Sequence, residues 1–265
     1  NLQSSLTLQT VAALCWREMI KFIRDRSRVI GALVQPLGFW LLLGLGFQGT
    51  FQMPSSVTGS VGYIEFLFPG IIALVILFTA IFSTISIVEE RQSGFLQAAL
   101  VAPAPRSALV MGNALGGTLL ATVQAVLFLF AVPAVGLPVD LGGLAFVVAI
   151  CFLTGLAFTA MGFSIAWRMD STRGFHAIMN LFLLPLWFLS GALFPLEGAS
   201  PLLRWLMWIN PVSYGVSGIR HGLYGLQDAP AVLATPGICL LVTAAFAALM
   251  IGFAAYTVRQ PLFKA

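Results

Sequence analysis

Long uncharged stretches dominate the hydrophobic pattern of this chain. Asp, Glu, Lys and Arg are absent from the ranges 29–64, 66–88, 107–139, 141–167, 174–196 and 229–258. A helix needs about 20 apolar residues to cross the hydrocarbon core of a membrane, so each stretch can hold one span. The pattern predicts an all-α polytopic membrane protein with six transmembrane helices, at 29–49, 66–88, 108–135, 141–167, 175–196 and 234–258. The stretches are continuously apolar, which excludes the alternating strands of a transmembrane barrel.

An amphipathic segment precedes the first span. Over 6–28, apolar side chains recur near helical spacing, opposite basic and acidic ones. This predicts a helix that lies in the plane of the inner membrane surface, with Trp16 among the headgroups and the basic side chains toward anionic lipid. An ordinary basic flank is the alternative. The charged start lacks the apolar stretch of a cleavable signal peptide, so we expect the first span to act as the insertion signal.

The connection between the second and third predicted spans is expected to carry a short apolar helix. We expect this helix at 93–101, because the residue before a proline leaves the α region and Pro103 follows. It would expose Phe95, Leu96 and Leu100 at the cytoplasm, where an apolar face needs a cover. A soluble partner would provide that cover. The alternative is that the helix packs against the floor of the bundle.

The connection between the fifth and sixth spans is too apolar for a solvated loop. Its longest uncharged run, 205–219, has 15 residues, too few to cross a membrane. The pattern predicts a re-entrant hairpin over 198–230, made of two half-helices that break at Asn210 and Pro211 and are shielded by protein or a water-filled cavity. A short amphipathic helix on the membrane surface is the alternative.

Composition and charge narrow the class of protein. The chain is 59% hydrophobic and only 8% charged, which excludes a soluble enzyme, a nucleic-acid binder and a disordered tail. Of the 13 basic residues, five precede the first span, and two lie in each of the second connection, the fourth connection and the C-terminal segment. Because short basic loops stay on the cytoplasmic side, both termini are expected there. We treat 1–265 as a single transmembrane domain, with interface helix 1–28, bundle 29–258 and cytoplasmic tail 259–265.

The chain lacks the chemistry of an ion-coupled transporter or an ATPase. His176, one turn inside the fifth span, is the one ionisable side chain well within a span, so no proton relay is visible. Neither Lys21 nor Lys264 follows a glycine, which excludes the phosphate-binding G-x-x-x-x-G-K-[ST] loop. The three cysteines have no C-x-x-C spacing, so we expect neither a disulfide nor a metal site. Active transport would need energy from another polypeptide.

Three motifs stand in order along the chain. They are Leu67-Phe68-Pro69-Gly70, then Glu90-Arg91-x-x-Gly94-x-Leu96-x-x-x-Leu100-x-x-Pro103, and then Leu193-Phe194-Pro195-Leu196-Glu197 leading to Pro201-x-Leu203-Arg204-x-Leu206-x-x-x-Asn210-Pro211-x-x-Tyr214. With six spans and an amphipathic start, the sequence resembles the permease subunits of type 2 ABC exporters. It departs from them at Gln97 and Asn113, where the family often has Glu and Lys.

The resemblance implies a homodimer or heterodimer of permease subunits in a bacterial plasma (inner) membrane. Two cytosolic ABC ATPase subunits would bind ATP and Mg, and the complex would export a lipid, a lipid-linked glycan or an amphipathic drug. This chain would carry no cofactor, no metal and no catalytic residue. The ATPase-coupling interface would comprise Arg17, Arg24, Glu90, Arg91, Gly94, Phe95, Leu96, Leu100 and Pro103. In the re-entrant hairpin, the residues that match the family motif are Arg204, Asn210, Pro211 and Tyr214.

Aromatic residues of the first and fifth spans are candidates for a cargo pathway. An aromatic, uncharged lining could be formed by Phe39, Trp40, Phe182, Trp187, Phe188 and Phe194. The alternative is that these rings face lipid or pack between helices. Two other functions stay open: a membrane scaffold that recruits a soluble partner without transport, and a membrane-embedded enzyme, for which no residue constellation is present.

Overall fold

The computed structural model describes residues 2–24, 26–47, 62–94, 106–137, 140–225 and 229–260. This part of the chain is helical and contains no strand. The α-helices are α1 (Leu2–Arg24), α2 (Arg26–Phe47), α3 (Tyr63–Ser83), α4 (Ile85–Gln92), α6 (Arg106–Leu129), α7 (Leu141–Ala166), α8 (Thr172–Phe188), α9 (Pro201–Ile209), α10 (Pro211–Tyr224) and α11 (Pro236–Arg259). Two short 3-10 helices cover Pro133–Val135 and Leu196–Gly198.

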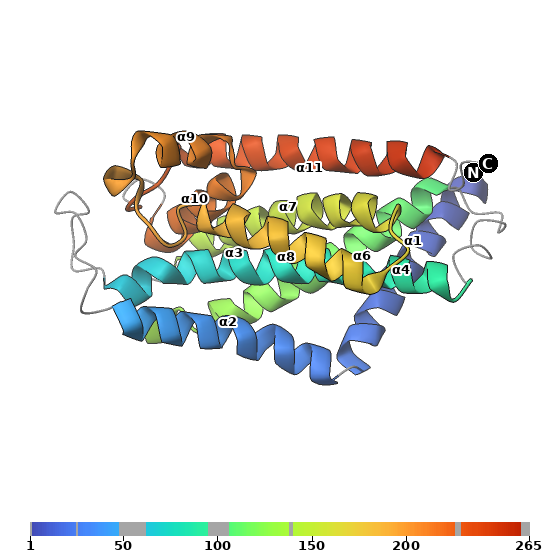
Figure 1. Ribbon diagram of the computed structural model, residues 1–265, viewed down its shortest axis with the longest axis horizontal. Helices are drawn as coiled ribbons and strands as arrows, with labels where there is room; N and C mark the ends of the chain where they lie inside the picture. Colours follow the sequence, from blue (N-terminus) through green and yellow to red (C-terminus); the bar gives the residue numbers. More distant parts are fainter. Residues whose placement is uncertain are drawn as a thin grey trace.

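The long helices lie side by side along the molecule, with α3 at the centre (Figure 1). Helix α3 is buried over most of its length and contacts α2, α6, α7, α8 and α10. Helices α1 and α4 lie at one end of this bundle, and α9 and α10 lie at the other (Figure 1). We refer to these as the α1 end and the α10 end.

Four described helices are long and apolar enough to cross a membrane. They cover Tyr63–Gln92, Ser107–Leu129, Leu141–Ala166 and Pro236–Arg259, at the positions of the second, third, fourth and sixth predicted spans. At the first predicted span, the apolar part of α2 is the shorter Val34–Phe47. At the fifth, α8 has 17 residues and ends at Phe188, not at 196, because the chain turns at Gly191, whose φ is +77°. Helix α6, which lies at the third predicted span, ends at Leu129, whereas the predicted span continues to 135.

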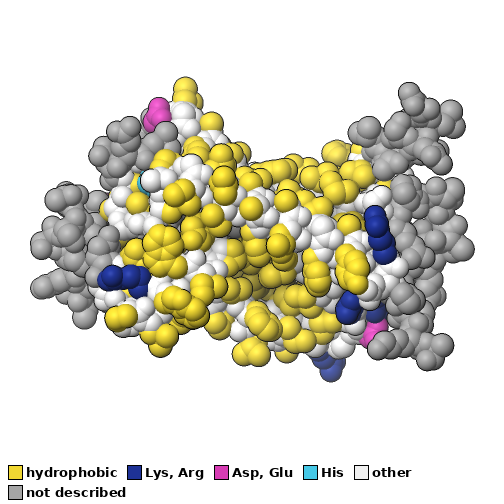
Figure 2. All heavy atoms as spheres, turned by 90° about the horizontal axis from the view of Figure 1, so that it is seen from above, with side chains coloured by type: hydrophobic (Ala, Val, Ile, Leu, Met, Phe, Trp, Pro, Cys, Tyr) yellow, Lys and Arg dark blue, Asp and Glu magenta, His cyan; other side chains and the backbone are white. Residues whose placement is uncertain are grey.

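The outside of the bundle is apolar. Figure 2 shows hydrophobic side chains across the middle of one face, with basic side chains near its two ends. Large exposed apolar side chains lie on several helices, among them Leu42, Leu181, Phe182, Leu241 and Phe253. Such a surface suits a lipid environment, because the exposure of a contiguous apolar face of this extent to water is energetically unfavourable.

Glycines bring α10 into direct contact with α7. A Cβ atom added to Gly143 would lie 2.2 Å from the carbonyl oxygen of Gly222, and one added to Gly222 would lie 2.4 Å from a methyl carbon of Val147. Small residues let membrane helices approach closely in this way. The two backbones therefore touch, and α10 lies within the bundle.

Candidate functional site

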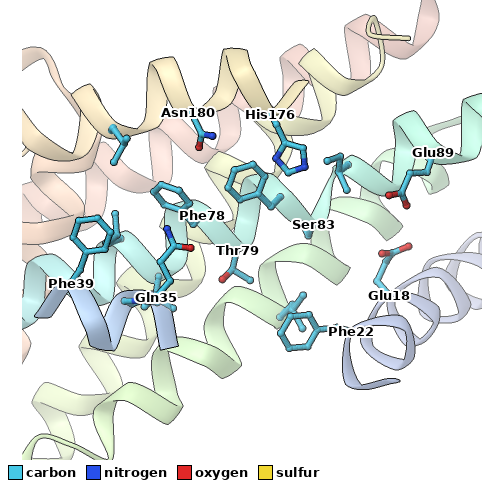
Figure 3. Close-up of a pocket in the computed structure, with 17 residues that line it drawn as sticks. Glu18, Phe22, Gln35, Phe39, Phe78, Thr79, Ser83, Glu89, His176 and Asn180 are labelled. Carbon is cyan, nitrogen blue, oxygen red and sulfur yellow. The ribbon is translucent and has the colours of Figure 1, made fainter. Parts of the chain in front are cut away.

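A cavity of about 550 Å³ lies in the half of the bundle toward the α1 end. Figure 3 shows its labelled residues coming from α1, α2, α3, α4 and α8. Its lining consists of Glu18, Phe22, Gln35, Pro36, Phe39, Leu74, Val75, Phe78, Thr79, Phe82, Ser83, Ile85, Glu89, Leu120, His176, Asn180 and Leu184. The volume is in the range of sites that bind drug-sized molecules.

Aromatic rings and polar side chains alternate on the cavity wall. Phe78 and Phe82 lie one turn apart on α3, with ring centroids 5.5 Å apart, and the Phe82 ring lies 4.9 Å from the imidazole of His176. Thr79 lies between the two phenylalanines in sequence, and its hydroxyl donates to Oε1 of the buried Gln124 on α6. The wall therefore offers an apolar surface with a few hydrogen-bonding groups.

Ion pairs connect α1 to α4 beside this cavity. Nη2 of Arg17 lies 2.6 Å from Oε1 of Glu90, and Nζ of Lys21 lies 3.1 Å from the same oxygen. Both cations also reach Oε1 of Glu18, at 3.0 and 3.5 Å. Four charges from two helices thus form one network.

Helix α1 also packs closely against α6. A Cβ atom on Gly112 would lie 2.7 Å from side-chain atoms of Leu14, so the two helices meet at this glycine. The thiol of Cys15 donates to the carbonyl oxygen of Gly112 at 3.4 Å. Burial raises the pKa of the Cys15 thiol, and the nearby Glu18 carboxylate raises it further.

Arg91 joins the end of α4 to the connection between α7 and α8. Its guanidinium donates to Oδ1 of Asp170 at 2.8 Å and to the carbonyl oxygen of Trp167. Gln92 donates to the carbonyl oxygen of Asp170 at 2.8 Å. A displacement of α4 would therefore also act on the α7–α8 connection.

The structure brings together part of the predicted coupling interface. Arg17 and Glu90 form an ion pair, Arg91 follows on α4, and Arg24 lies exposed at the end of α1. Ser93 and Gly94 form a turn, with a φ of +76° at Gly94, so no helix begins at Ser93 as predicted. The remaining coupling residues, Phe95, Leu96, Leu100 and Pro103, lie outside the described residues. Their contact with an ATPase stays a prediction.

The six aromatic residues proposed for the cargo pathway have different surroundings. Phe39 lines the cavity. The indole of Trp40 donates to the carbonyl oxygen of Ile64, and the fully buried Trp187 donates to that of Gly70 at 2.7 Å, so both make structural contacts. The other three, Phe182, Phe188 and Phe194, are exposed. Cargo contact by any of the six remains a prediction.

Sequence reasoning missed most of the cavity. The sequence places His176 one turn inside the fifth span without a ligand-binding role, and Phe78, Thr79 and Phe82 fall within the second predicted span. The available signal was periodicity: His176 and Asn180 lie four residues apart on α8, as Phe78 and Phe82 do on α3. Each pair shares one helix face, but only the fold brings the two faces together.

Two helices meet at the predicted break in the connection before α11. Helix α9 ends at Ile209 and α10 begins at Pro211, with Asn210 between them. Nδ2 of Asn210 donates to the carbonyl oxygen of Leu186 at 2.6 Å, and its Oδ1 accepts from the backbone N–H of Val212 at 3.0 Å. The hydroxyl of Tyr214 donates to the carbonyl oxygen of Trp208, and Arg204 is exposed on α9. The break at Asn210 is therefore confirmed, and its placement in a membrane stays a prediction.

Arg220 on α10 is buried at this end, which the sequence analysis did not foresee. Its guanidinium donates to the carbonyl oxygens of Ala231 at 2.7 Å and Gly191 at 2.8 Å, and lies 4.2 Å from the centre of the Phe66 ring. On the same helix, the Tyr224 hydroxyl donates to the carbonyl oxygen of Glu65 at 2.7 Å. Arg220 thus connects α10 to α3 and to two connecting segments.

No group that could hold a metal ion occurs in the described part of the chain. The described residues contain no cluster of three or more His, Cys, Asp or Glu side chains. Cys15, Cys151 and Cys239 are free thiols.

The helical bundle and its apolar exterior define a polytopic membrane protein, and sequence comparison identifies its family. Residues 9–224 match the ABC-2 type transporter family, to which the chain therefore belongs.

Three relatives carry informative names. A protein of Porphyra purpurea named as transport permease ycf38 is 28% identical over 225 residues, which cover 83% of this chain and 76% of that protein. The inner membrane transport permease YadH of Escherichia coli K12 is 25% identical over 185 residues, or 69% and 72% of the two chains. Nodulation protein J of Neorhizobium galegae is 26% identical over 230 residues, or 83% of each. Within this family, the chain is a transport permease.

Proposed function

We propose that this chain is the permease subunit of an ATP-driven exporter. It would move a lipid, a lipid-linked glycan or an amphipathic drug outward across a bacterial plasma membrane, as a dimer bound to two cytosolic ATPase subunits that carry ATP and Mg. Both termini would lie in the cytoplasm, α1 in the plane of the membrane surface and the α9–α10 hairpin re-entrant at the outer side. The observation that carries the proposal is the ion-pair network between α1 and α4, next to the cavity.

The proposed coupling route runs from α4 to the cavity. Helix α4 follows α3 with only Thr84 between them, and α3 supplies Phe78, Thr79 and Phe82 to the cavity wall. An ATPase that presses on the segment after α4 would displace α4, and the displacement would reach the cavity as a shift of packed helices. The ion pairs between α1 and α4 lie beside this route, and because their cations are partly exposed, α4 would move relative to α1 at low cost.

The apolar segment after α4 provides the test. We expect Leu96→Glu and Leu100→Glu to abolish co-purification with the proposed ATPase partner, and to abolish stimulation of its ATP hydrolysis, because a buried carboxylate is costly at an apolar interface. Leu202→Glu, at an exposed leucine of α9, is the matched control and should leave both unchanged. If both variants bind and stimulate the ATPase normally, the coupling assignment is wrong.

Transport is tested separately in vesicles. The permease and its ATPase, reconstituted together, should move a fluorescent lipid or amphipathic drug only when ATP is present. A scaffold would bind the ATPase yet move nothing, so complex formation without ATP-dependent movement would contradict the proposed function.

A further inference from the structure

The charged side chains on the cavity wall are both acidic, within the part of the chain that the structure describes. Glu18 comes from α1 and Glu89 from α4, and Figure 3 shows their carboxylates near one another at the same side of the cavity. His176 is the other titratable side chain of the described lining. A molecule in the cavity therefore meets negative charge without a facing Lys or Arg from these segments.

The two carboxylates differ in how they are balanced. Glu18 is buried and lies within ion-pair distance of Arg17 and Lys21, which also bind Glu90. These four side chains carry two positive and two negative charges. Glu89 is exposed and makes no ion pair or hydrogen bond with the residues that the structure describes. The negative charge of Glu89 is therefore available to a positively charged ligand in the cavity.

The rest of the wall suits an apolar body that carries a positive charge. The rings of Phe22, Phe39, Phe78 and Phe82 line the cavity. Aromatic rings attract cations through their negative faces, and they bury apolar surface at the same time. The side-chain amides of Gln35 and Asn180 can orient a polar group. An anion of equal size would lose its hydration and face Glu89 with no compensating Lys or Arg among the described lining residues.

We propose that this cavity binds an amphipathic cation of drug size, with Glu89 as its counter-charge. The inference rests on the proposed function, since it names the class of cargo that the exporter would take. An anionic lipid or glycan headgroup is disfavoured at this site for the electrostatic reason given above.

Two ions of equal shape and opposite charge make the test direct. Equilibrium binding of tetraphenylphosphonium and of tetraphenylborate is measured on the purified full chain in a non-ionic detergent, without ATPase. Wild type should bind the phosphonium more tightly than the borate. Glu89→Gln should weaken phosphonium binding by roughly fivefold, the effect of one partly solvated charge pair, and should not weaken borate binding.

The matched control is Asp140→Asn, which removes an exposed carboxylate outside the cavity lining and keeps a side-chain oxygen that can accept from the backbone N–H of Gly143 at the start of α7. It should leave both affinities unchanged, while partition of the ions into detergent is the same for every variant. Equal affinities of wild type for the two ions, no phosphonium binding, or a phosphonium loss equal in both variants would overturn the inference.

The same measurement separates this inference from the proposed function. Charge-selective binding that depends on Glu89, in a complex that shows no ATP-dependent movement, would support the site and refute the exporter. ATP-dependent movement of an uncharged lipid, with no charge selectivity in binding, would overturn the site and leave the exporter standing.

Discussion

The two ends of the bundle are held by different kinds of contact. At the α1 end, ion pairs join partly exposed cations to largely buried carboxylates: Lys21 is 41% and Arg17 25% exposed, whereas Glu90 is 12% and Glu18 6% exposed. At the α10 end, side chains bind backbone carbonyls inside the protein: Arg220, 2% exposed, donates to Gly191 and Ala231, and Asn210 donates to Leu186. One end is held by ion pairs whose cations reach the surface, and the other by hydrogen bonds that are buried with their donors.

This difference indicates which end can move at low cost. An exposed ion pair contributes about 0–1 kcal/mol, because water and salt replace the lost partner. A buried carbonyl that loses a charged donor has no such replacement, and its desolvation costs about 1–3 kcal/mol. We therefore expect α1 and α4 to shift against one another readily, while α10 keeps its place. An ATPase that acts at the α1 end would therefore act on the helices that move at the lower energetic cost.

The largest effect should come from Arg220→Met. The substitution keeps much of the side-chain volume but removes both hydrogen bonds and the contact with the Phe66 ring. We expect the free energy of unfolding to fall by about 3 kcal/mol, the sum expected for two buried charge-assisted hydrogen bonds. Thermal unfolding in detergent, followed by intrinsic tryptophan fluorescence, measures the change.

Arg204→Met is the matched control for that experiment, because Arg204 lies exposed on the neighbouring α9. Its melting temperature should stay close to that of wild type. Equal melting temperatures for the two variants would mean that Arg220 does not fasten the α10 end.

The next largest effect should come from Gly143→Ala. The added methyl group would meet the carbonyl oxygen of Gly222 at 2.2 Å, so α7 and α10 would have to separate. Overpacking of this kind costs about 1–3 kcal/mol. Gly252→Ala on α11, where nothing lies within 4 Å of the new methyl, should leave the melting temperature unchanged or raise it slightly. Similar stability of both variants would show that the α7–α10 contact is not tight.

The sequence predicted where helices form better than what their side chains contact. Uncharged stretches located the helices because a charge at membrane depth is costly, and Asn210 with Pro211 located the break before α10 because proline cannot continue a preceding helix. The burial of Arg220 was not predictable in this way. A single arginine in an apolar segment indicates a loop unless the carbonyl acceptors, which come from distant positions, are known.

The cavity escaped prediction for a related reason. Its wall combines α1, α2, α3, α4, α6 and α8, and residues such as Phe22 and His176 line the same cavity only after folding. Periodicity assigns side chains to a helix face but does not say which faces meet. The end of α8 was also placed too late, because the turn depends on the left-handed backbone of Gly191 rather than on hydrophobicity.

A smaller effect is expected at the α1 end from Glu90→Gln. The substitution removes the ion pairs to Arg17 and Lys21, both partly exposed, and should lower the free energy of unfolding by no more than about 1 kcal/mol. A double-mutant cycle with Arg17→Gln at low and high salt isolates the pair, and the coupling should shrink as salt rises. A loss as large as that of Arg220→Met would remove the contrast between the two ends.

The smallest effect concerns the reactivity of Cys15 on α1. Burial and the Glu18 carboxylate raise the pKa of its thiol, so the reactive thiolate is scarcer at pH 7.5 than for a free cysteine. Maleimide labelling of Cys15, followed by peptide mass spectrometry, should therefore be slow at pH 7.5 and accelerate as the pH rises. Glu18→Gln removes the negative charge, lowers the pKa and should speed labelling roughly two- to threefold at pH 7.5. A labelling rate that depends neither on pH nor on the Glu18→Gln substitution would contradict this expectation. It would mean that movement of α1 away from α6, rather than ionisation of the thiol, limits the reaction, and that the α1 end is more mobile than its ion pairs suggest.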